Sequence, residues 1–404
     1  MILILRYLFG VPFIALCCFT TWRVFRSRPY DNSYDNVTVA LAKTRPQRIG
    51  KNYNLFAASV TPVLVLACNR PKNLRRVLNQ LFRLVKSEKY DVVISHGCNN
   101  DATEQVARSF SATYIKQPDQ SPIFSDKQLF GSEGYQRVCR HYQWALDKTI
   151  NILYPEAQTI VVLEDDLDLS NDLFDYFDSL RDALLSNENL LCVSGFNDNG
   201  KPGNVDMNNP CRLWWTDFFP GLGWMATTKL IRELLPKWPK TYWDDWLREP
   251  EQRKGRVCIR PEIAKTTTFG KAGVSVGQFF DKHLAKILLN TKQCRYNSTS
   301  IKQERYQDKA MAELHRLEVV NILNIDKFVG SNKSVKMLPK TVLEWEEACN
   351  FLNIMEDIRG GVARNSFKGI VPTMYKGIRV FIVQPRTPRA GRNEIVDAHT
   401  TMGV

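Results

Sequence analysis

The chain has 404 residues, more than one hydrophobic core usually organises, so we expect one large domain with appendages. With 44% apolar and 24% charged residues it lacks the composition of a disordered chain, and its length excludes a small disulfide scaffold. The net charge of +13 is densest near the N-terminus, where residues 1–60 carry eight Lys or Arg against two Asp or Glu. A nucleic-acid enzyme would concentrate positive charge in its working domain, so we expect no nucleic-acid partner.

An apolar segment follows the first six residues. Residues 7–22 read YLFGVPFIALCCFTTW and carry no charge. Together with residues 2–6 they are long enough to span a bilayer as a helix, since the side chain of Arg6 can reach the interface. We therefore predict a cytosolic tail over 1–6, a signal anchor over 7–22 and a polar stem over 23–58. A cleaved signal peptide is the alternative, although no small-residue cleavage site is obvious.

Two features favour a body on the lumenal side of that anchor. Sequons begin at Asn36, Asn297 and Asn332, and each would be a glycosylation acceptor in the lumen. The ten cysteines show no C-x-x-C zinc spacing and fit an oxidising compartment. The arginines directly after the apolar segment oppose this orientation under the positive-inside rule. We nevertheless predict a single-pass type II membrane protein, and eight cysteines outside the anchor leave 105 pairings open.

The body alternates strand and helix patterns from residue 60 onward. Buried-strand patterns alternate with amphipathic ones in this order: strand 62–68, helix 72–84, strand 90–95, helix 101–110, strand 113–116, helix 135–153, strand 159–163 and a helix from Asp172 to 185. This alternation predicts a doubly wound α/β sheet, whose ligands bind at the carboxyl ends of the strands.

Glu164, Asp165 and Asp166 follow directly on one of these strands. Adjacent carboxylates at a strand end repel one another unless a cation neutralises them, and oxygen ligands suit Mg²⁺ or Mn²⁺. We therefore predict a divalent metal site at this triplet rather than a solvated loop. The acidic residues from 168 to 178 are different, because capping and the dipole of the following helix explain them.

A second group of functional residues is expected within the aromatic stretch 214–248. Trp243 and Trp246 flank Asp244 and Asp245. A carboxylate among indoles is partly desolvated, which raises its pKa toward that of a general base. An ordinary helix-capping pair explains the same spacing equally well.

Eight segments of the body together indicate a family. They read PVLVLACNR, QPD, RHYQWAL, VVLEDDLDLSNDLFDYF, CVSGFNDNGK, TDFFPGLGW, PKWPKTYWDDWLREPEQRKGRVCIRPE and TFGKAGVSVGQFFDKHL. These segments resemble the N-acetylglucosaminyltransferase I family, the α-1,3-mannosyl-glycoprotein 2-β-N-acetylglucosaminyltransferases of the Golgi. They run from Pro62 to Leu284 in the family's order, and a weaker match, SFKGIVPTMYKGIRVFIVQP, follows near the C-terminus.

The resemblance implies a GT-A type, doubly wound mixed sheet over residues 59–300 and a smaller C-terminal domain over 301–404. It implies transfer of GlcNAc from UDP-GlcNAc, with Mn²⁺ and inversion, in β-1,2 linkage to the α-1,3-linked mannose of high-mannose N-glycans in the Golgi. A protein O-mannose β-1,2-N-acetylglucosaminyltransferase and an inactive lectin-like scaffold are the alternatives. The short stem opposes the first, and the intact acidic residues oppose the second.

Position by position, the resemblance also assigns roles. Asp166 looks like the metal ligand and Asp244 like the catalytic base. The residues that resemble donor contacts are Arg70, His141, Asp165 and Ser275, the last in a segment, 270–283, similar to a lid. The implied disulfides are Cys68 with Cys98 and Cys192 with Cys258. Cys139 is expected to be free or buried, and Cys211, Cys294 and Cys349 stay unassigned.

One position departs from the family pattern. The family places an aspartate that reads uracil directly before Cys98, and this chain has Gly97 there. We expect His96, Asn99 or a water to read the base instead, with looser discrimination. We also expect Gly97→Asp to tighten UDP binding, provided that the backbone needs no positive φ at this position.

Overall fold

The described part of the chain begins at the first predicted strand. This computed structural model describes residues 60–85, 88–119, 121, 133–296, 312 and 314–385, all in the unit Val39–Val404. The tail, anchor and stem predicted for residues 1–58 lie outside these ranges and stay predictions. Within these ranges no helix is both long enough and apolar enough to cross a membrane.

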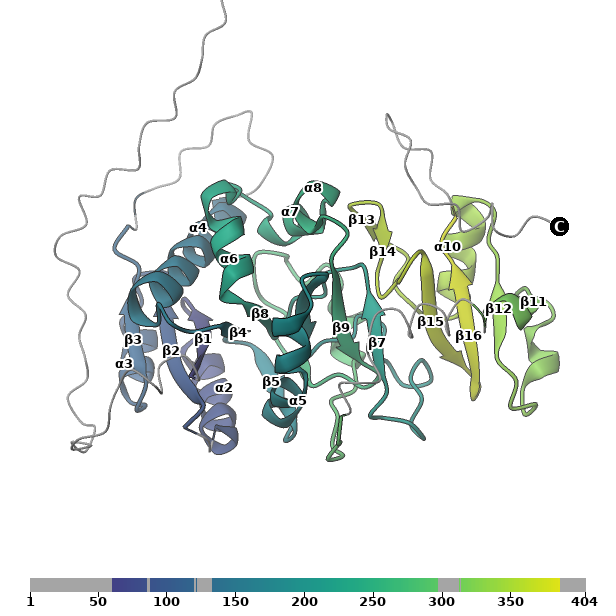
Figure 1. Cartoon of the computed structure of the whole chain (residues 1–404), viewed down its shortest axis with the longest axis horizontal. Coiled ribbons are helices and arrows are strands. Elements are labelled where there is room, and N and C mark those ends of the chain that lie inside the picture. Colours follow the sequence, from purple (N-terminus) through teal and green to yellow (C-terminus); the bar gives the residue numbers. More distant parts are fainter. Residues whose placement is uncertain are drawn as a thin grey trace, which may run out of the picture. The chain divides into compact units, whose positions relative to one another are not determined.

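A mixed sheet forms the larger part of the described chain. Its strands are Thr61–Ala67 (β1), Tyr90–His96 (β2), Thr113–Lys116 (β3), Thr159–Glu164 (β4), Leu190–Ser194 (β6), Leu213–Thr216 (β7), Trp224–Thr227 (β8) and Val257–Pro261 (β9). Their order across the sheet is β3-β2-β1-β4-β8-β6-β9-β7 (Figure 1). The first four are mutually parallel, whereas β8 and β7 run antiparallel to their neighbours. The mixed α/β sheet expected from the sequence is therefore confirmed.

Helices cover both faces of this sheet. They are Pro71–Leu84 (α2), Asp101–Arg108 (α3), Glu133–Asp147 (α4), Leu173–Ser186 (α5), Thr228–Leu234 (α6), Trp243–Arg248 (α7) and Pro250–Arg253 (α8). Short 3₁₀ turns span Leu235–Lys237 and Leu284–Lys286. The helix expected over 135–153 ends as α4 at Asp147 and continues as a π-helical turn over Lys148–Leu153.

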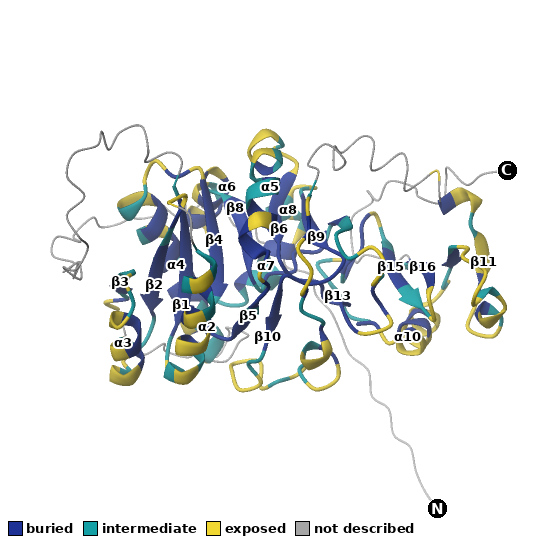
Figure 2. Ribbon diagram, turned by 90° about the horizontal axis from the view of Figure 1, so that it is seen from below, coloured by how far each residue is buried: buried dark blue, intermediate teal, exposed yellow. Residues whose placement is uncertain are grey.

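The alternation of side chains along β1 explains the two helical layers. Val63 and Val65 face one way and pack with buried residues of α2, α3 and α5. Leu64 and Leu66 face the other way and pack with α4, α6 and α7. Successive side chains on a strand point to opposite faces, so a continuous apolar run needs cover on both. Figure 2 shows the buried strands between helices that expose only their outer sides.

A smaller sheet and two two-stranded pairs complete the described elements. The smaller sheet contains Glu318–Val320 (β11), Val335–Met337 (β12), Ile370–Tyr375 (β15) and Ile378–Val383 (β16), in the order β11-β12-β16-β15. Helix Val342–Phe351 (α10) packs on it in a separate hydrophobic cluster, and a 3₁₀ turn spans Ile325–Phe328. The two-stranded pairs are Leu167–Leu169 (β5) with Thr266–Thr268 (β10), and Ile358–Arg359 (β13) with Val362–Ala363 (β14). A domain boundary at residue 300 stays a prediction.

The structure contains both implied disulfides and a third. Cys68 pairs with Cys98, joining the loops after β1 and β2, and Cys192 pairs with Cys258, its register partner in the adjacent strand. Cys211 pairs with Cys294. Cys139 is free and buried as expected, and so is Cys349.

Candidate functional site

The candidate site lies at the edge of the main sheet where β1 and β4 end. These two strands are parallel neighbours, so their carboxyl ends meet at the same edge. Arg70 lies between β1 and α2, and Glu164 ends β4, with Asp165 and Asp166 directly after it. The sheet therefore brings the predicted metal ligand and two of the predicted donor contacts together.

Arg70 partly neutralises the acidic triplet. Its Nη1 donates to Asp166 Oδ2 at 2.6 Å, and its Nη2 donates to Asp165 Oδ1. Both aspartates are buried. Burial raises the pKa of Asp165 to about 6, although Arg70 acts in the opposite direction. Burial, followed by the charge of Asp166, raises the pKa of Glu164 to about 7. One guanidinium therefore does not fully compensate three adjacent carboxylates.

Two carboxylate oxygens at this edge have no partner. Asp165 Oδ2 and Asp166 Oδ1 are buried and accept no hydrogen bond. Such oxygens are costly to bury and are the ligands that Mg²⁺ and Mn²⁺ bind. No group of three His, Cys, Asp or Glu in the described ranges has the arrangement of a metal cage. Ions of this kind usually combine one or two carboxylates with waters and substrate phosphates, so the two aspartates fit a divalent cation.

A cavity of about 560 Å³ opens beside Arg70, between the start of α2 and residues 269–272. The carbonyl of Ala272 accepts a hydrogen bond from Arg70 Nη1 at 3.3 Å. Gly270 lies so close to the acidic triplet that a Cβ atom there would fall 1.9 Å from Asp166 Oδ2. An arginine at the N-terminus of a helix favours anionic ligands, so the cavity suits the phosphates of a nucleotide.

Ser275 is not brought into this cluster. It is exposed on the predicted lid segment, and in the part of the chain that the structure describes its side chain makes no hydrogen bond to Arg70 or to the aspartates. Its neighbour Val276 is 89% exposed and has a φ of 51°. The role of Ser275 as a phosphate contact stays a prediction.

Asp244 lies on α7, which an aromatic cluster fixes in place. The buried ring of Trp243 stacks on Tyr142 at 4.2 Å and on Trp238 at 5.8 Å between ring centroids. Arg248 Nη1 donates to Asp244 and to Asp245, in each case at 2.8 Å. The side chain of Asp244 is 40% exposed and is therefore only partly buried beside the indoles. Its role as the general base stays a prediction.

Tyr142 links the acidic triplet to Asp244. Its hydroxyl donates to Glu164 Oε1 at 2.5 Å, while its ring stacks on the neighbour of Asp244. Burial raises the pKa of Tyr142 well above its ordinary value, and Glu164, Asp244 and Asp166 each add to this effect. The acidic triplet and Asp244 therefore both act electrostatically on the buried hydroxyl of Tyr142. The sequence analysis assigned Tyr142 no role, although it lies within the RHYQWAL segment.

His141 occupies the place where a side chain at residue 97 would lie. A Cβ atom on Gly97 would fall 2.3 Å from Nδ1 of His141, whose Nε2 pairs with Ser95 Oγ at 2.8 Å. Gly97 has no positive φ, so its backbone would accept an aspartate. The imidazole fills that space and therefore opposes the expected tightening of UDP binding by Gly97→Asp.

His96 is also unavailable for reading a base. Its ring is buried, its Nδ1 pairs with the Tyr114 hydroxyl, and its Nε2 pairs with the Cys68 carbonyl, each at 2.9 Å. That alternative is therefore wrong. Asn99 is exposed and stays a candidate, as does a water.

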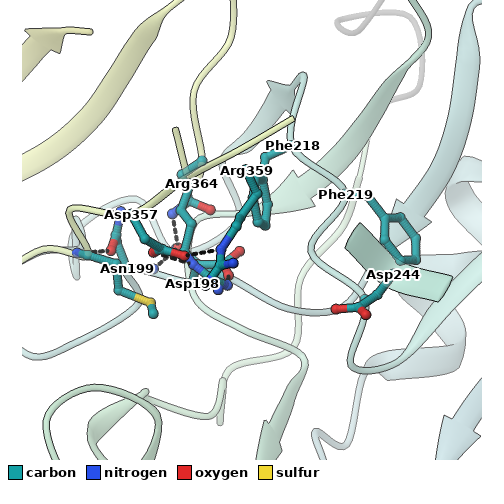
Figure 3. Close-up of polar contacts among 12 residues, drawn as sticks. Asp198, Asn199, Phe218, Phe219, Asp244, Asp357, Arg359 and Arg364 are labelled. Carbon is teal, nitrogen blue, oxygen red and sulfur yellow. Dashed lines mark hydrogen bonds and ion pairs between the residues drawn. The ribbon is translucent and has the colours of Figure 1, made fainter. Parts of the chain in front are cut away.

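The segment FNDNGK joins the large sheet to the C-terminal elements, which the sequence analysis did not foresee. Arg364 donates to Asp198 at 2.5 Å and to Asp357 at 2.7 Å, as Figure 3 shows. The buried ammonium of Lys201 contacts Nδ1 of His283 at 2.9 Å and Asn353 Oδ1 at 3.0 Å. A run of polar residues that becomes buried indicates a contact with another part of the chain. The sequence alone does not identify the contacting residues, which lie more than 80 residues away.

An edge of this kind serves the transfer of a sugar from a nucleotide to a hydroxyl group. One group of carboxylates can neutralise a departing diphosphate, and a separate carboxylate can take a proton from the incoming hydroxyl. Together with the sequence resemblance to a glycosyltransferase family, this arrangement defines the class of the protein as a glycosyltransferase.

Comparison with known proteins gives the family. The model of the GNT-I family matches residues 35–394, and the chain belongs to this family. One curated relative, from Arabidopsis thaliana, is 32% identical over 339 residues, which are 81% of this chain and 74% of the relative. That relative is named alpha-1,3-mannosyl-glycoprotein 2-beta-N-acetylglucosaminyltransferase.

Solved structures give more distant likenesses. A mannosyltransferase from Pyrobaculum calidifontis, in complex with GDP-Man and Mn²⁺, is 16% identical with a TM-score of 0.38, over 56% of this chain and 62% of that one. TarS residues 1–349 of S. aureus are 13% identical with a TM-score of 0.36, over 50% and 58%. These likenesses are too weak to inform the function.

Proposed function

We propose that this chain is an inverting glycosyltransferase that moves GlcNAc from UDP-GlcNAc in β-1,2 linkage to the α-1,3-linked mannose of high-mannose N-glycans. Membership of the GNT-I family and the name of the Arabidopsis relative support this function. The structural observation that carries the proposal is Tyr142, whose hydroxyl donates to Glu164 of the acidic triplet and whose ring stacks on Trp243, the neighbour of Asp244. The reaction would open the synthesis of hybrid and complex N-glycans.

Each residue at the edge has a part in this chemistry. Asp166 would hold Mn²⁺, as expected, and the partnerless oxygen of Asp165, which was expected only to contact the donor, would hold the ion as well. The ion would supply positive charge where the diphosphate leaves. Arg70 donates to the same phosphates from the start of α2. Asp244 is exposed enough to meet the acceptor and takes the proton of its attacking hydroxyl. A single displacement inverts the anomeric carbon, so no protein nucleophile is needed.

The proposed location is the Golgi membrane, with the body in the lumen. Three disulfides fit an oxidising compartment. Asn332, the start of one sequon, is exposed, as a glycosylation acceptor must be. The anchor and its orientation are part of this proposal.

The two alternatives are less well supported. An O-mannose enzyme would share the donor and the chemistry, but the curated relative named above acts on an α-1,3-mannosyl glycoprotein. A scaffold without turnover would not need to keep two partnerless carboxylate oxygens beside an arginine.

A donor-consumption assay tests the function. The purified full-length protein is given UDP-GlcNAc and Mn²⁺ with a high-mannose N-glycan, with an O-mannosyl peptide or with no acceptor. We expect rapid UDP release only with the N-glycan. Faster release with the O-mannosyl peptide would contradict the proposed acceptor. Asp166→Asn should abolish transfer and weaken Mn²⁺-dependent UDP binding in calorimetry, because one of the two metal carboxylates is lost.

A further inference from the structure

Two partly exposed tyrosine rings pack against each other, one of them close in the chain to Asp244. Tyr135 lies at the start of α4 and Tyr242 directly precedes α7, and their ring centroids are 4.4 Å apart with an interplanar angle of 35°. Both residues are partly exposed. The pair is therefore not part of the buried aromatic cluster around Trp243.

The backbone at Tyr242 is held in an unusual conformation. Its φ is 47° and its ψ is 51°, a left-handed conformation that a bulky residue seldom adopts. Such strain persists only where surrounding structure imposes it, and it gathers at ligand sites. Here it orients the Tyr242 ring against Tyr135 while the chain turns into α7, which carries Asp244.

Arg359 approaches the same surface from the C-terminal elements. Its Nη1 lies 3.8 Å from Asp245 Oδ2, its Nε donates to Asp357 at 3.3 Å, and its side chain is 38% exposed. The nearby Arg364 differs, because it is almost buried between Asp198 and Asp357 (Figure 3). Arg364 fixes the hairpin, and Arg359 keeps donors that face solvent.

These groups act on one another electrostatically. Burial and Tyr242 raise the pKa of Tyr135, Asp244 and Asp245 add to this effect, and Arg359 opposes it. Direct contacts connect the same groups, although they come from three separate parts of the chain. Tyr135 packs on Tyr242, which directly precedes the helix that carries both carboxylates. Arg359 lies 3.8 Å from Asp245 on that helix.

We propose that the two tyrosines and Arg359 form a subsite for a neutral hexose of the acceptor glycan, next to Asp244. A hexose has an apolar C–H face that stacks on aromatic rings and hydroxyl groups that accept hydrogen bonds from a guanidinium. The carboxylates would repel a phosphorylated or acidic sugar, so the subsite favours an uncharged one. This inference rests on the proposed function and adds residues that bind its acceptor.

Steady-state kinetics with saturating UDP-GlcNAc and Mn²⁺ test the subsite. Arg359→Gln should raise the KM for a high-mannose N-glycan about tenfold, the effect of losing one charge-assisted hydrogen bond. Tyr135→Ala should raise it several-fold, and Tyr135→Phe, which keeps the ring, should restore most of the affinity that Tyr135→Ala loses. Arg359→Lys should restore part of the affinity. The matched control is Lys376→Gln, which removes another exposed cation paired with a carboxylate, Asp326, from the C-terminal sheet.

The possible outcomes distinguish a failure of the proposed subsite from a failure of the proposed function. An unchanged acceptor KM with a lower kcat in Arg359→Gln and Tyr135→Ala would overturn the inference. It would show that both residues only position Asp244 and do not bind the acceptor. A wild type that transfers to no mannose glycan would instead contradict the proposed function. In that case saturation-transfer NMR of the N-glycan still decides the subsite, because its signals should weaken in Tyr135→Ala and persist in Tyr135→Phe. Equal signals in both would overturn it.

Discussion

The imidazole of His141 fills the space next to Gly97 at the end of β2. A side chain at residue 97 would begin 2.3 Å from the imidazole, and Ser95 holds the far nitrogen of that ring. The glycine and the histidine are therefore sterically interdependent, although 44 positions separate them in the chain.

Gly97→Ala should weaken UDP binding, because even a methyl group forces the His141 ring out of its place. Overpacking a filled site of this kind costs about 1–3 kcal/mol. Gly97→Asp should weaken binding at least as much, despite adding a carboxylate that could read uracil. Calorimetry of UDP on both variants measures the effect, and tighter binding by Gly97→Asp would show that the ring moves without cost.

Gly270→Ala should reduce Mn²⁺-dependent UDP binding. Its Cβ atom would overlap Asp166 Oδ2, so either the carboxylate or the segment 269–272 must move. Gly273→Ala is the matched control in the predicted lid segment, 270–283, since its Cβ atom would approach nothing more closely than Arg70 Nη1 at 4.0 Å. Calorimetry with and without Mn²⁺ should show the loss in the first variant alone. Equal losses in both would indicate that the segment tolerates no substitution, for reasons unrelated to Asp166.

The strands and helices from β1 to α5 could be predicted because their patterns are local. The apolar run of β1 and the amphipathic period of α2 lie within single segments, and the acidic triplet follows its strand directly. The exposure of Asp244 could not be predicted, because it depends on which side of α7 the aromatic cluster covers. The burial of Lys201 depends on a contact with Asn353, 152 residues away, and no local sequence pattern predicts that contact.

Asp244→Asn should leave UDP affinity nearly unchanged and lower turnover by about 10² or more, the usual effect of losing a general base. The amide keeps the contact with Arg248, so α7 should stay in place. Asp245→Asn is the matched control, since Arg248 contacts both carboxylates at the same distance. Single-turnover rates and calorimetry separate the two effects. A larger loss of turnover in Asp245→Asn would assign the base to that neighbour.

The contact between Lys201 and His283 predicts a pH dependence of stability. Burial, followed by the charges of Lys201 and Lys282, lowers the pKa of His283 to about 4, and the more distant Glu356 and Asp357 oppose this only in part. In the unfolded chain the imidazole has its ordinary pKa of about 6.5. Between these values the unfolded chain binds a proton that the folded protein does not, so acid favours unfolding. The stability is complete above pH 6.5 and is lost as the pH falls toward 4.

His283→Asn should flatten this dependence. Asparagine offers an acceptor oxygen near the position of Nδ1, so the contact with Lys201 persists while the titrating ring is removed. Thermal unfolding between pH 4.5 and 7.5 should show a smaller fall in Tm for the variant than for the wild type. His315→Asn removes an exposed histidine and should leave the dependence of Tm on pH as it is in the wild type. Identical slopes for the wild type and His283→Asn would mean that His283 titrates alike in the folded and unfolded states. The acid sensitivity would then have to come from other buried groups, such as His141, whose pKa burial lowers to about 3.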